Sequence, residues 1–307
     1  MEQQLNLGVL VFNQSLFVRQ LLESISNQTI QRTPLVIVDN CSSDCSFNEI
    51  KESLEKYHLS ESTTLVRNRF NSGSAEGLRQ LLELSQTKYM AVLHGDDVLE
   101  PNYIELVLQT IEKDSSCQAL NVTLKSYSDN PSTSFSKAFY RPAWFSNSKL
   151  NRFLVCGLNP GVMPGSVLER QYVLDRELLD FPFPVNGVED TLLWMRIIRS
   201  GGKIRSIYDP CYNYRIHESQ FSHSDERNSF YFGFARRIII AESSSLAERL
   251  LALSEINYEI KRFGMHSRYI EGLGNVYSKN YRLYSLLRIL NVLLRRISVI
   301  SAEKRYR

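Results

Sequence analysis

Two adjacent aspartates follow an apolar run in the stretch VLHGDDVLEP, residues 92–101. Asp96 and Asp97 stand where a buried strand formed by the preceding apolar residues would end. Two like charges at the edge of a core repel each other and lose hydration, so this arrangement is unfavourable unless a cation or a hydroxyl-rich ligand binds there. The stretch therefore predicts a ligand site.

A second acidic pair, Glu189 and Asp190, precedes apolar residues with helical spacing, among them Leu193, Trp194 and Ile197. The helix dipole favours a carboxylate in the first turn, which is a structural role. A carboxylate within hydrogen-bond distance of a hydroxyl can also accept its proton, which is a catalytic role. The spacing alone leaves both roles open.

These residues need a framework that positions them, and the first 115 residues alternate between strand and helix patterns. Four apolar runs predict buried strands, at residues 7–12, 34–40, 63–68 and 89–93. Apolar residues at helical spacing follow each run, and Pro101 stands where it can open the fourth helix. Buried strands that alternate with helices predict a mostly parallel sheet with helices on both faces.

Polar residues follow all four predicted strands. Such sheets bind ligands beyond the carboxyl ends of their strands. A single residue there could be a helix cap or a turn residue, but four groups at one edge predict a binding site. The residues at these ends are Phe12 and Asn13, Asp39 and Asn40, Asn71, Ser72 and Gly73, and Asp96 and Asp97.

Neither the glycine pattern of dinucleotide-binding proteins nor that of P-loop proteins follows the first predicted strand. Phosphate groups are then expected to bind through a divalent cation, because Mg²⁺ is commonly held by one or two carboxylates together with substrate phosphates. The predicted ligand is a nucleoside diphosphate compound.

The segments VLVFNQS, LVIVDNCSSD, RNRFNSGSAEG and YMAVLHGDDVLEPNY resemble the N-terminal half of family 2 glycosyltransferases. The segments NPGVMPGSVLERQYV and GVEDTLLWMRIIRSGGKIRSIYDPCYNYRIHESQFS resemble the acceptor side of that family. The resemblance runs over roughly residues 5–222 in the family's order. It implies an α/β protein of the GT-A fold, with a mostly parallel central sheet, helices on both faces and a C-terminal helical extension.

The resemblance implies roles at the nucleotide. Phe12, Asn13 and Asp39 would hold the base, and a carboxylate at the base edge suits uracil or thymine. Asn71 and Asp96 complete the residues expected to bind the nucleotide sugar, with Asp96 at the ribose.

The resemblance also implies a site for Mn²⁺ or Mg²⁺. Here His94 stands where many family members have the first aspartate of a D-x-D pattern. Asp97 is therefore assigned to the metal, although Asp96 and Asp97 could exchange or share their roles. His217 would complete the metal site, because imidazole is a plausible third ligand.

On the acceptor side, the resemblance makes Asp190 the catalytic base. Glu189 and Trp144 are the residues expected near the acceptor. Trp144 would either form a platform for a sugar ring or contribute to the core.

The predicted domains are a GT-A catalytic domain, residues 1–222, and a helical extension, residues 223–307. The catalytic domain would consist of a nucleotide-binding half, residues 1–115, and an acceptor-side half, residues 116–222. The C-terminal helices would pack on the catalytic domain or, as an alternative, form a homodimer.

The last 29 residues, 279–307, contain eight Lys or Arg and one Glu, whereas the whole chain has a formal charge of +3. This tail also carries a leucine-rich stripe flanked by arginines, which suits a helix on an anionic membrane surface. The alternative is a terminal helix packed on the protein. A net positive charge concentrated in a tail, with a net negative charge on the rest of the chain, argues against binding of nucleic acid.

Five cysteines without C-x-x-C spacing favour a reducing, cytoplasmic environment. The sequence shows no signal-peptide pattern and no apolar run of about 18 residues, so neither export nor a membrane span is expected. The expected location is the cytoplasm, with peripheral attachment to the inner face of the cell membrane.

The predicted function is an inverting, metal-dependent transfer of a sugar from a UDP- or dTDP-sugar to a hydroxyl of a growing bacterial surface glycan such as O-antigen or capsule. The acceptor is expected to be lipid-linked. One alternative is a partner protein that keeps the GT-A fold without activity. Another is a sugar nucleotidyltransferase, whose basic, glycine-rich phosphate loop is missing from VFNQSLFVRQ.

Overall fold

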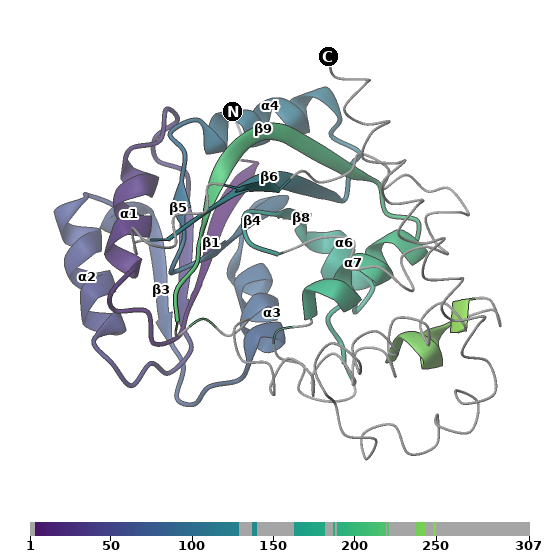
Figure 1. The fold of residues 1–307 in the computed structure, drawn as a ribbon, viewed down its shortest axis with the longest axis horizontal. Coiled ribbons are helices and arrows are strands. Elements are labelled where there is room, and N and C mark those ends of the chain that lie inside the picture. The colour runs from purple at the N-terminus through teal and green to yellow at the C-terminus, as the bar shows by residue number, and fades with distance from the viewer. Residues whose placement is uncertain are drawn as a thin grey trace. The chain divides into compact units, whose positions relative to one another are not determined.

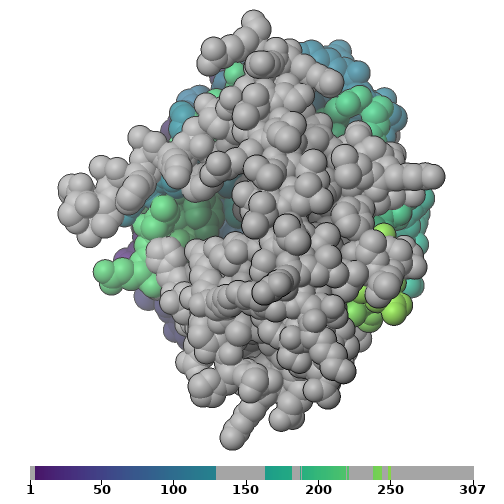
Figure 2. Space-filling view, turned by 45° about the vertical axis from the view of Figure 1, so that its right-hand side comes forward, coloured from purple at the N-terminus to yellow at the C-terminus, as the bar shows by residue number. Residues whose placement is uncertain are grey.

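The computed structural model describes residues 4–128, 137–139, 163–181, 187, 189–218, 220, 238–243 and 248–249, which are coloured in Figure 1 and Figure 2. The chain forms two compact units. The first unit comprises Met1–Arg141, Val162–Pro184 and Lys203–His217; the second comprises Pro142–Gly161, Val185–Gly202 and Glu218–Arg307. The predicted domain boundary at residue 222 stays a prediction.

A nine-stranded sheet forms the centre of the first unit. Its strand order is β3-β2-β1-β4-β8-β6-β9-β5, and β7 pairs with β6. The strands are β1 (Leu5–Val11), β2 (Leu35–Asp39), β3 (Thr63–Arg67), β4 (Tyr89–His94), β5 (Val98–Leu99), β6 (Ala119–Tyr127), β7 (Lys137–Phe139), β8 (Val167–Glu169) and β9 (Ile204–Arg215).

The four strands predicted from the apolar runs pair in parallel, as β3-β2-β1-β4. The other half of the sheet is mixed. Strand β8 pairs antiparallel with both β4 and β6, β5 pairs antiparallel with β9, and β6 pairs antiparallel with β7 and parallel with β9. The short β5 follows the double aspartate directly and joins the distant β9, so this pairing brings the C-terminal end of β9 close to the acidic loop.

The helices of the described residues are α1 (Val18–Ser26), α2 (Ser46–Lys56), α3 (Ser74–Leu84), α4 (Tyr103–Lys113), α6 (Arg170–Asp175) and α7 (Glu189–Arg199), with a 3₁₀ turn η1 (Ser60–Ser62). Four residues with the predicted helical spacing, Val18, Leu21, Leu22 and Ile25, are buried on α1. This apolar stripe explains why α1 lies on the sheet, since burial of one helix face supplies most of a helix's stability in a protein.

Helices cover both faces of the sheet in the first unit. Buried residues of α1, α2 and α4 share one hydrophobic core with Leu7, Val9 and Val11 of β1, and Figure 1 shows α1 and α2 side by side. Alternate side chains of a strand point to opposite faces, so Leu10 points the other way. There α3 approaches so closely that a Cβ on Gly77 would lie 2.5 Å from Leu10 Cδ1.

Among the residues that the structure describes, no helix combines the length and apolar character that crossing a membrane requires. The tail, residues 279–307, lies outside the described residues, as do most of the extension, residues 223–307, and Trp144. The predictions for these segments therefore stay predictions.

Candidate functional site

The loop after β1 is fixed against the start of α2. The Asn13 N–H donates to Ser42 Oγ at 3.0 Å, and Asn13 Oδ1 accepts from the Ser43 N–H at 2.8 Å. The next residue, Gln14, donates its N–H to Ser46 Oγ at 2.7 Å. Asn13 has a φ of 53°, a conformation that asparagine adopts more readily than most residues. The first two strand ends are therefore joined into one surface, as predicted.

Asp39, at the end of β2, is fully buried and paired with Arg67 at the end of β3. Arg67 Nε lies 3.2 Å from Asp39 Oδ2, while the Ser42 N–H donates to Asp39 Oδ1 at 3.3 Å. The Arg67 guanidinium also lies 4.8 Å from the ring centroid of Phe47. Its side chain is 47% exposed, so a ligand at this edge can reach the arginine. Arg67 was not among the predicted site residues, although its position at the end of a predicted strand could have indicated it.

Asn71 shapes the turn that leads into α3. Asn71 Oδ1 accepts from Asn40 Nδ2 at 3.0 Å and from the Gly73 N–H at 2.9 Å. Asn40 Oδ1 in turn accepts from the Ser72 N–H at 3.1 Å. These bonds join the ends of β2 and β3. Phe12, the predicted base-stacking residue, is 44% exposed and so remains accessible to a ligand.

The acidic loop places three metal-ligand side chains together. Ligand atoms of His94, Asp96 and Asp97 all lie within 4.8 Å of one another. His217 joins this group, because its Nε2 lies 3.1 Å from Asp96 Oδ2. This separation is that of a hydrogen bond, and it brings an imidazole and a carboxylate, two groups that can bind metal ions, into direct contact. Asp96 and His217, two of the residues predicted for the metal, are therefore in contact, whereas His94 was not among the predicted ligands; the metal role stays a prediction.

The two aspartates have different surroundings. Asp97 is fully buried; its Oδ2 accepts from the Tyr212 hydroxyl at 2.8 Å and its Oδ1 from the Arg215 N–H at 2.9 Å. Burial and the nearby Asp96 charge raise the pKa of Asp97 well above its usual value. For Asp96, burial acts in the same direction, but the hydrogen bond with His217 and the nearby His94 hold its pKa below the usual value. Both Asp97 oxygens are therefore engaged by Tyr212 and Arg215, whereas Asp96 faces His217.

His94 is held at the edge of this group. Its backbone N–H donates to the Tyr212 hydroxyl at 3.3 Å. Burial lowers the pKa of the His94 imidazole, with Asp96 opposing this effect. The ring is therefore uncharged at neutral pH, which is the form that can bind a metal or a hydroxyl group.

Gly95, in the acidic loop, lies where close packing leaves no room for a side chain. A Cβ on Gly95 would lie 2.4 Å from Gln14 Oε1 and 3.1 Å from Val11 Cγ2. The loop after β1 therefore lies directly against the loop after β4, and the base-side and metal-side residues form one continuous site within the first unit.

Asp190 lies in the second unit, in the first turn of α7. Its Oδ1 accepts from the N–H of Thr191 at 2.6 Å and is 3.2 Å from Thr191 Oγ1. The adjacent Glu189 is buried. The sequence prediction that this pair opens a helix is confirmed, whereas its catalytic and acceptor roles stay predictions.

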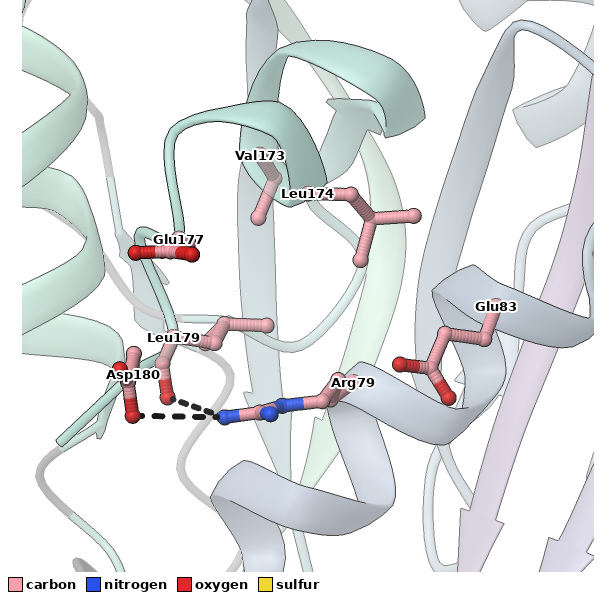
Figure 3. A pocket seen from close by; sticks show the side chains of 7 residues that line it. All are labelled: Arg79, Glu83, Val173, Leu174, Glu177, Leu179 and Asp180. Atoms are coloured by element: carbon pink, nitrogen blue, oxygen red, sulfur yellow. Dashed lines mark hydrogen bonds and ion pairs between the residues drawn. The ribbon is translucent and has the colours of Figure 1, made fainter.

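A separate small cavity lies between α3 and α6, with a volume of about 280 Å³ (Figure 3). Arg79 crosses it and binds the Leu179 carbonyl at 3.3 Å, with Asp180 at 3.9 Å. Glu83 and Glu177 also line it. None of the residues predicted to form the site contributes to this cavity.

The fold and the site together define an α/β protein with a cluster of potential metal ligands beside the carboxyl ends of its parallel strands. Residues 7–176 match the family model described as Glycosyl transferase family 2. This match covers more than half of the chain, so the chain belongs to glycosyl transferase family 2.

A curated relative, EpsH of Bacillus subtilis, which is assigned to the glycosyltransferases, is 24% identical over 246 residues. The alignment covers 75% of this chain and 66% of EpsH, so the chain spans just under two thirds of that relative's length.

Two solved structures share the fold. S. aureus TarS, residues 1–349, in complex with UDP-GlcNAc, has a TM-score of 0.62 at 16% identity, over 84% of this chain and 73% of that chain. The mannosyltransferase PcManGT of Pyrobaculum calidifontis, in complex with GDP-Man and Mn²⁺, has a TM-score of 0.60 at 16% identity, over 98% and 86%. The predicted GT-A fold is confirmed.

Proposed function

We propose that this protein is an inverting glycosyltransferase that uses a divalent metal ion and a UDP- or dTDP-sugar donor, and that its acceptor is a hydroxyl group of a bacterial surface glycan. The observation that carries this proposal is the pair of Asp96 and His217, 3.1 Å apart beside the base-side loops of a family 2 chain.

Asp96 and His217 would hold the metal ion. Imidazole suits transition metals and carboxylate suits Mg²⁺ and Mn²⁺, so the donor set fits Mn²⁺ well. The ion, when bound, stabilises negative charge on the departing diphosphate. Of the two roles left open for the aspartates, the surroundings support Asp96 at the metal, while Asp97 supports the loop through Tyr212 and Arg215.

Asp39 and Arg67 would read the base. Asp39 accepts hydrogen bonds and Arg67 donates them, a pair that complements an N–H next to a carbonyl. Uracil and thymine present this edge, and so does guanine. A GDP-sugar is therefore the second candidate donor, as in the complex of PcManGT.

Asp190 would be the general base. In a single displacement, the acceptor oxygen bonds to the anomeric carbon while the bond from that carbon to the diphosphate oxygen breaks. The acceptor's proton passes to the Asp190 carboxylate, and the bonding pair leaves with the diphosphate. Attack opposite the leaving group inverts the anomeric centre. Glu189 and Trp144 would contact the acceptor.

The acceptor would be lipid-linked, with the basic tail, residues 279–307, on the anionic inner face of the cell membrane. Each Lys or Arg near such a surface contributes about 1 kcal/mol, so four of the eight basic residues would hold the protein there.

The proposal is tested by a screen of UDP-, dTDP- and GDP-sugars with and without Mn²⁺, in which thermal unfolding and donor hydrolysis are measured. A donor at about 100 times its Kd stabilises the fold by about 2.7 kcal/mol. We expect that a UDP- or dTDP-sugar stabilises the protein, and is hydrolysed by it, only when Mn²⁺ is present. A response only to GDP-sugars would mean that the site binds guanine instead of uracil or thymine. A protein that binds no donor would be a non-catalytic member of the fold.

A further inference from the structure

Arg215, at the C-terminal end of β9, is a fully buried charged residue. A buried guanidinium is costly unless its donors are satisfied, so its contacts indicate what it stabilises. Those contacts lie on the loop of Asp96 and Asp97 and on the start of α1.

Arg215 holds the acidic loop from two sides. Its backbone N–H donates to Asp97 Oδ1 at 2.9 Å, and its Nε donates to the Asp96 carbonyl at 2.7 Å. The first bond fixes a side chain and the second fixes the backbone of the neighbouring residue. Together they restrain the peptide unit that carries the proposed metal ligand.

The same guanidinium reaches α1 and the histidine segment. Its Nη2 donates to Gln20 Oε1 on α1, and its carbon lies 4.9 Å from the ring centroid of Phe17. Phe17 in turn stacks on the His217 ring, with centroids 4.5 Å apart. A second aromatic ring, Tyr127, lies 4.8 Å from the guanidinium on β6. One side chain therefore contacts the Asp96 backbone, helix α1 and the ring that packs on His217.

We propose that Arg215 is a positioning residue that sets the spacing of Asp96 and His217, and thereby the metal affinity of the site. The metal ion in this inference rests on the proposed function, whereas the positioning by Arg215 rests on the contacts described above. Arginine is required because Nε and Nη2 bond in different directions from one planar group, whereas a lysine ammonium is a single point charge. A lysine here keeps the charge and the backbone N–H bond to Asp97, but it cannot bond to the Asp96 carbonyl and to Gln20 as Nε and Nη2 do.

The experiment compares the full-length chain with Arg215→Lys. Partners that orient a metal ligand typically change metal affinity by about 10- to 100-fold, so the Mn²⁺ Kd, measured by electron paramagnetic resonance of free Mn²⁺, should rise by that factor. Amide hydrogen exchange of residues 94–99, measured without metal, should become at least about tenfold faster, because the loop opens locally more often.

Two further variants distinguish positioning from general damage. Gln20 is exposed on α1, and Gln20→Met removes only the partner of Arg215 Nη2. This variant should fold and should show smaller changes of the Mn²⁺ Kd and of the amide exchange rate. Arg19→Lys, one residue away and ion-paired with Glu49 at 2.7 Å on the surface, should leave both readouts at the wild-type values.

The outcomes separate the two proposals. Unchanged exchange and unchanged Mn²⁺ affinity in a folded Arg215→Lys protein would overturn the role of Arg215. Faster loop exchange in Arg215→Lys and Gln20→Met, in a wild-type chain that binds no Mn²⁺, would support the positioning of the loop and overturn the metal part of both proposals.

Discussion

Substitution of Gly165 by alanine should cost about 2–5 kcal/mol of unfolding free energy. Gly165 has a φ of 73°, and a left-handed conformation costs about 1–2 kcal/mol for a residue with a Cβ. The added Cβ would lie 2.5 Å from Tyr212 Cδ2 and 2.8 Å from Val122 Cγ2, so the ring must move. Overpacking of this kind costs about 1–3 kcal/mol.

The displacement should reach the metal-side residues. The Tyr212 hydroxyl donates to Asp97 Oδ2 at 2.8 Å and accepts from the His94 N–H at 3.3 Å. A ring pushed away from Gly165 therefore withdraws the support of the acidic loop. The Mn²⁺ affinity of Gly165→Ala should fall along with its stability.

Urea unfolding followed by far-UV circular dichroism measures the cost as a shift of the midpoint at constant m-value. The partner experiment repeats Gly165→Ala in a Val122→Ala background, where the clash with Val122 Cγ2 is gone and the clash with the Tyr212 ring remains. The cost should then drop by about 0.5 kcal/mol or more, as expected for residues in contact. A cost below about 1 kcal/mol, or strict additivity of the two substitutions, would refute the packing argument.

Four further predictions address the acids and the tail. Asp190→Asn should lower turnover by about 10²–10⁴ with donor binding kept, measured by steady-state kinetics; full turnover would exclude the general base. Asp96→Asn should abolish Mn²⁺ binding, whereas Asp97→Ala, which leaves the Tyr212 hydroxyl and the Arg215 N–H without their acceptor, should lose about 1–3 kcal/mol in a urea melt; loss of Mn²⁺ binding in Asp97→Ala but not in Asp96→Asn would return the metal to Asp97. The pKa of Asp114 is held well below its usual value by the hydrogen bond from Lys203 and by other partners, so its contribution is fully present above about pH 4 and is lost as the pH falls toward the folded-state pKa; Asp114→Asn should be less stable than wild type at pH 7, with a difference that shrinks below pH 4, and a pH-independent difference would contradict this. Deletion of residues 279–307 should abolish salt-sensitive co-sedimentation with anionic vesicles, and equal sedimentation of both proteins would leave the tail as ordinary structure.

The parallel half of the fold follows from local sequence. Short apolar runs and a repeating helical spacing report burial directly, so β1 to β4 and the buried face of α1 could be predicted. The pairing in the mixed half of the sheet could not be predicted in this way. Pairing of the two-residue β5 with β9 depends on contacts more than 100 residues apart, for which one sequence carries no local signal.

The candidate site, like the fold, could be predicted only in part from the sequence. Asp96 and Asp97 could be chosen because carboxylates at a strand end suit a metal ion, whereas His217 was indicated only by the resemblance to family 2. The difference between the two aspartates depends on Tyr212 and Arg215, whose positions follow from the folded sheet. Charged residues are almost never fully buried unless paired, so composition alone would place Arg215 on the surface.

The sequence separation of 121 between Asp96 and His217 also determines when the proposed metal site can form. Ribosomes add about 5–20 residues per second, so the acidic loop is synthesised roughly 6–24 seconds before its histidine partner. During that interval the nascent chain holds two crowded carboxylates without the imidazole and without the Arg215 contacts. The pair of Asp96 and His217 therefore forms only after β9 has been made and has joined the sheet, so metal binding at the proposed site would report that the first unit has finished folding.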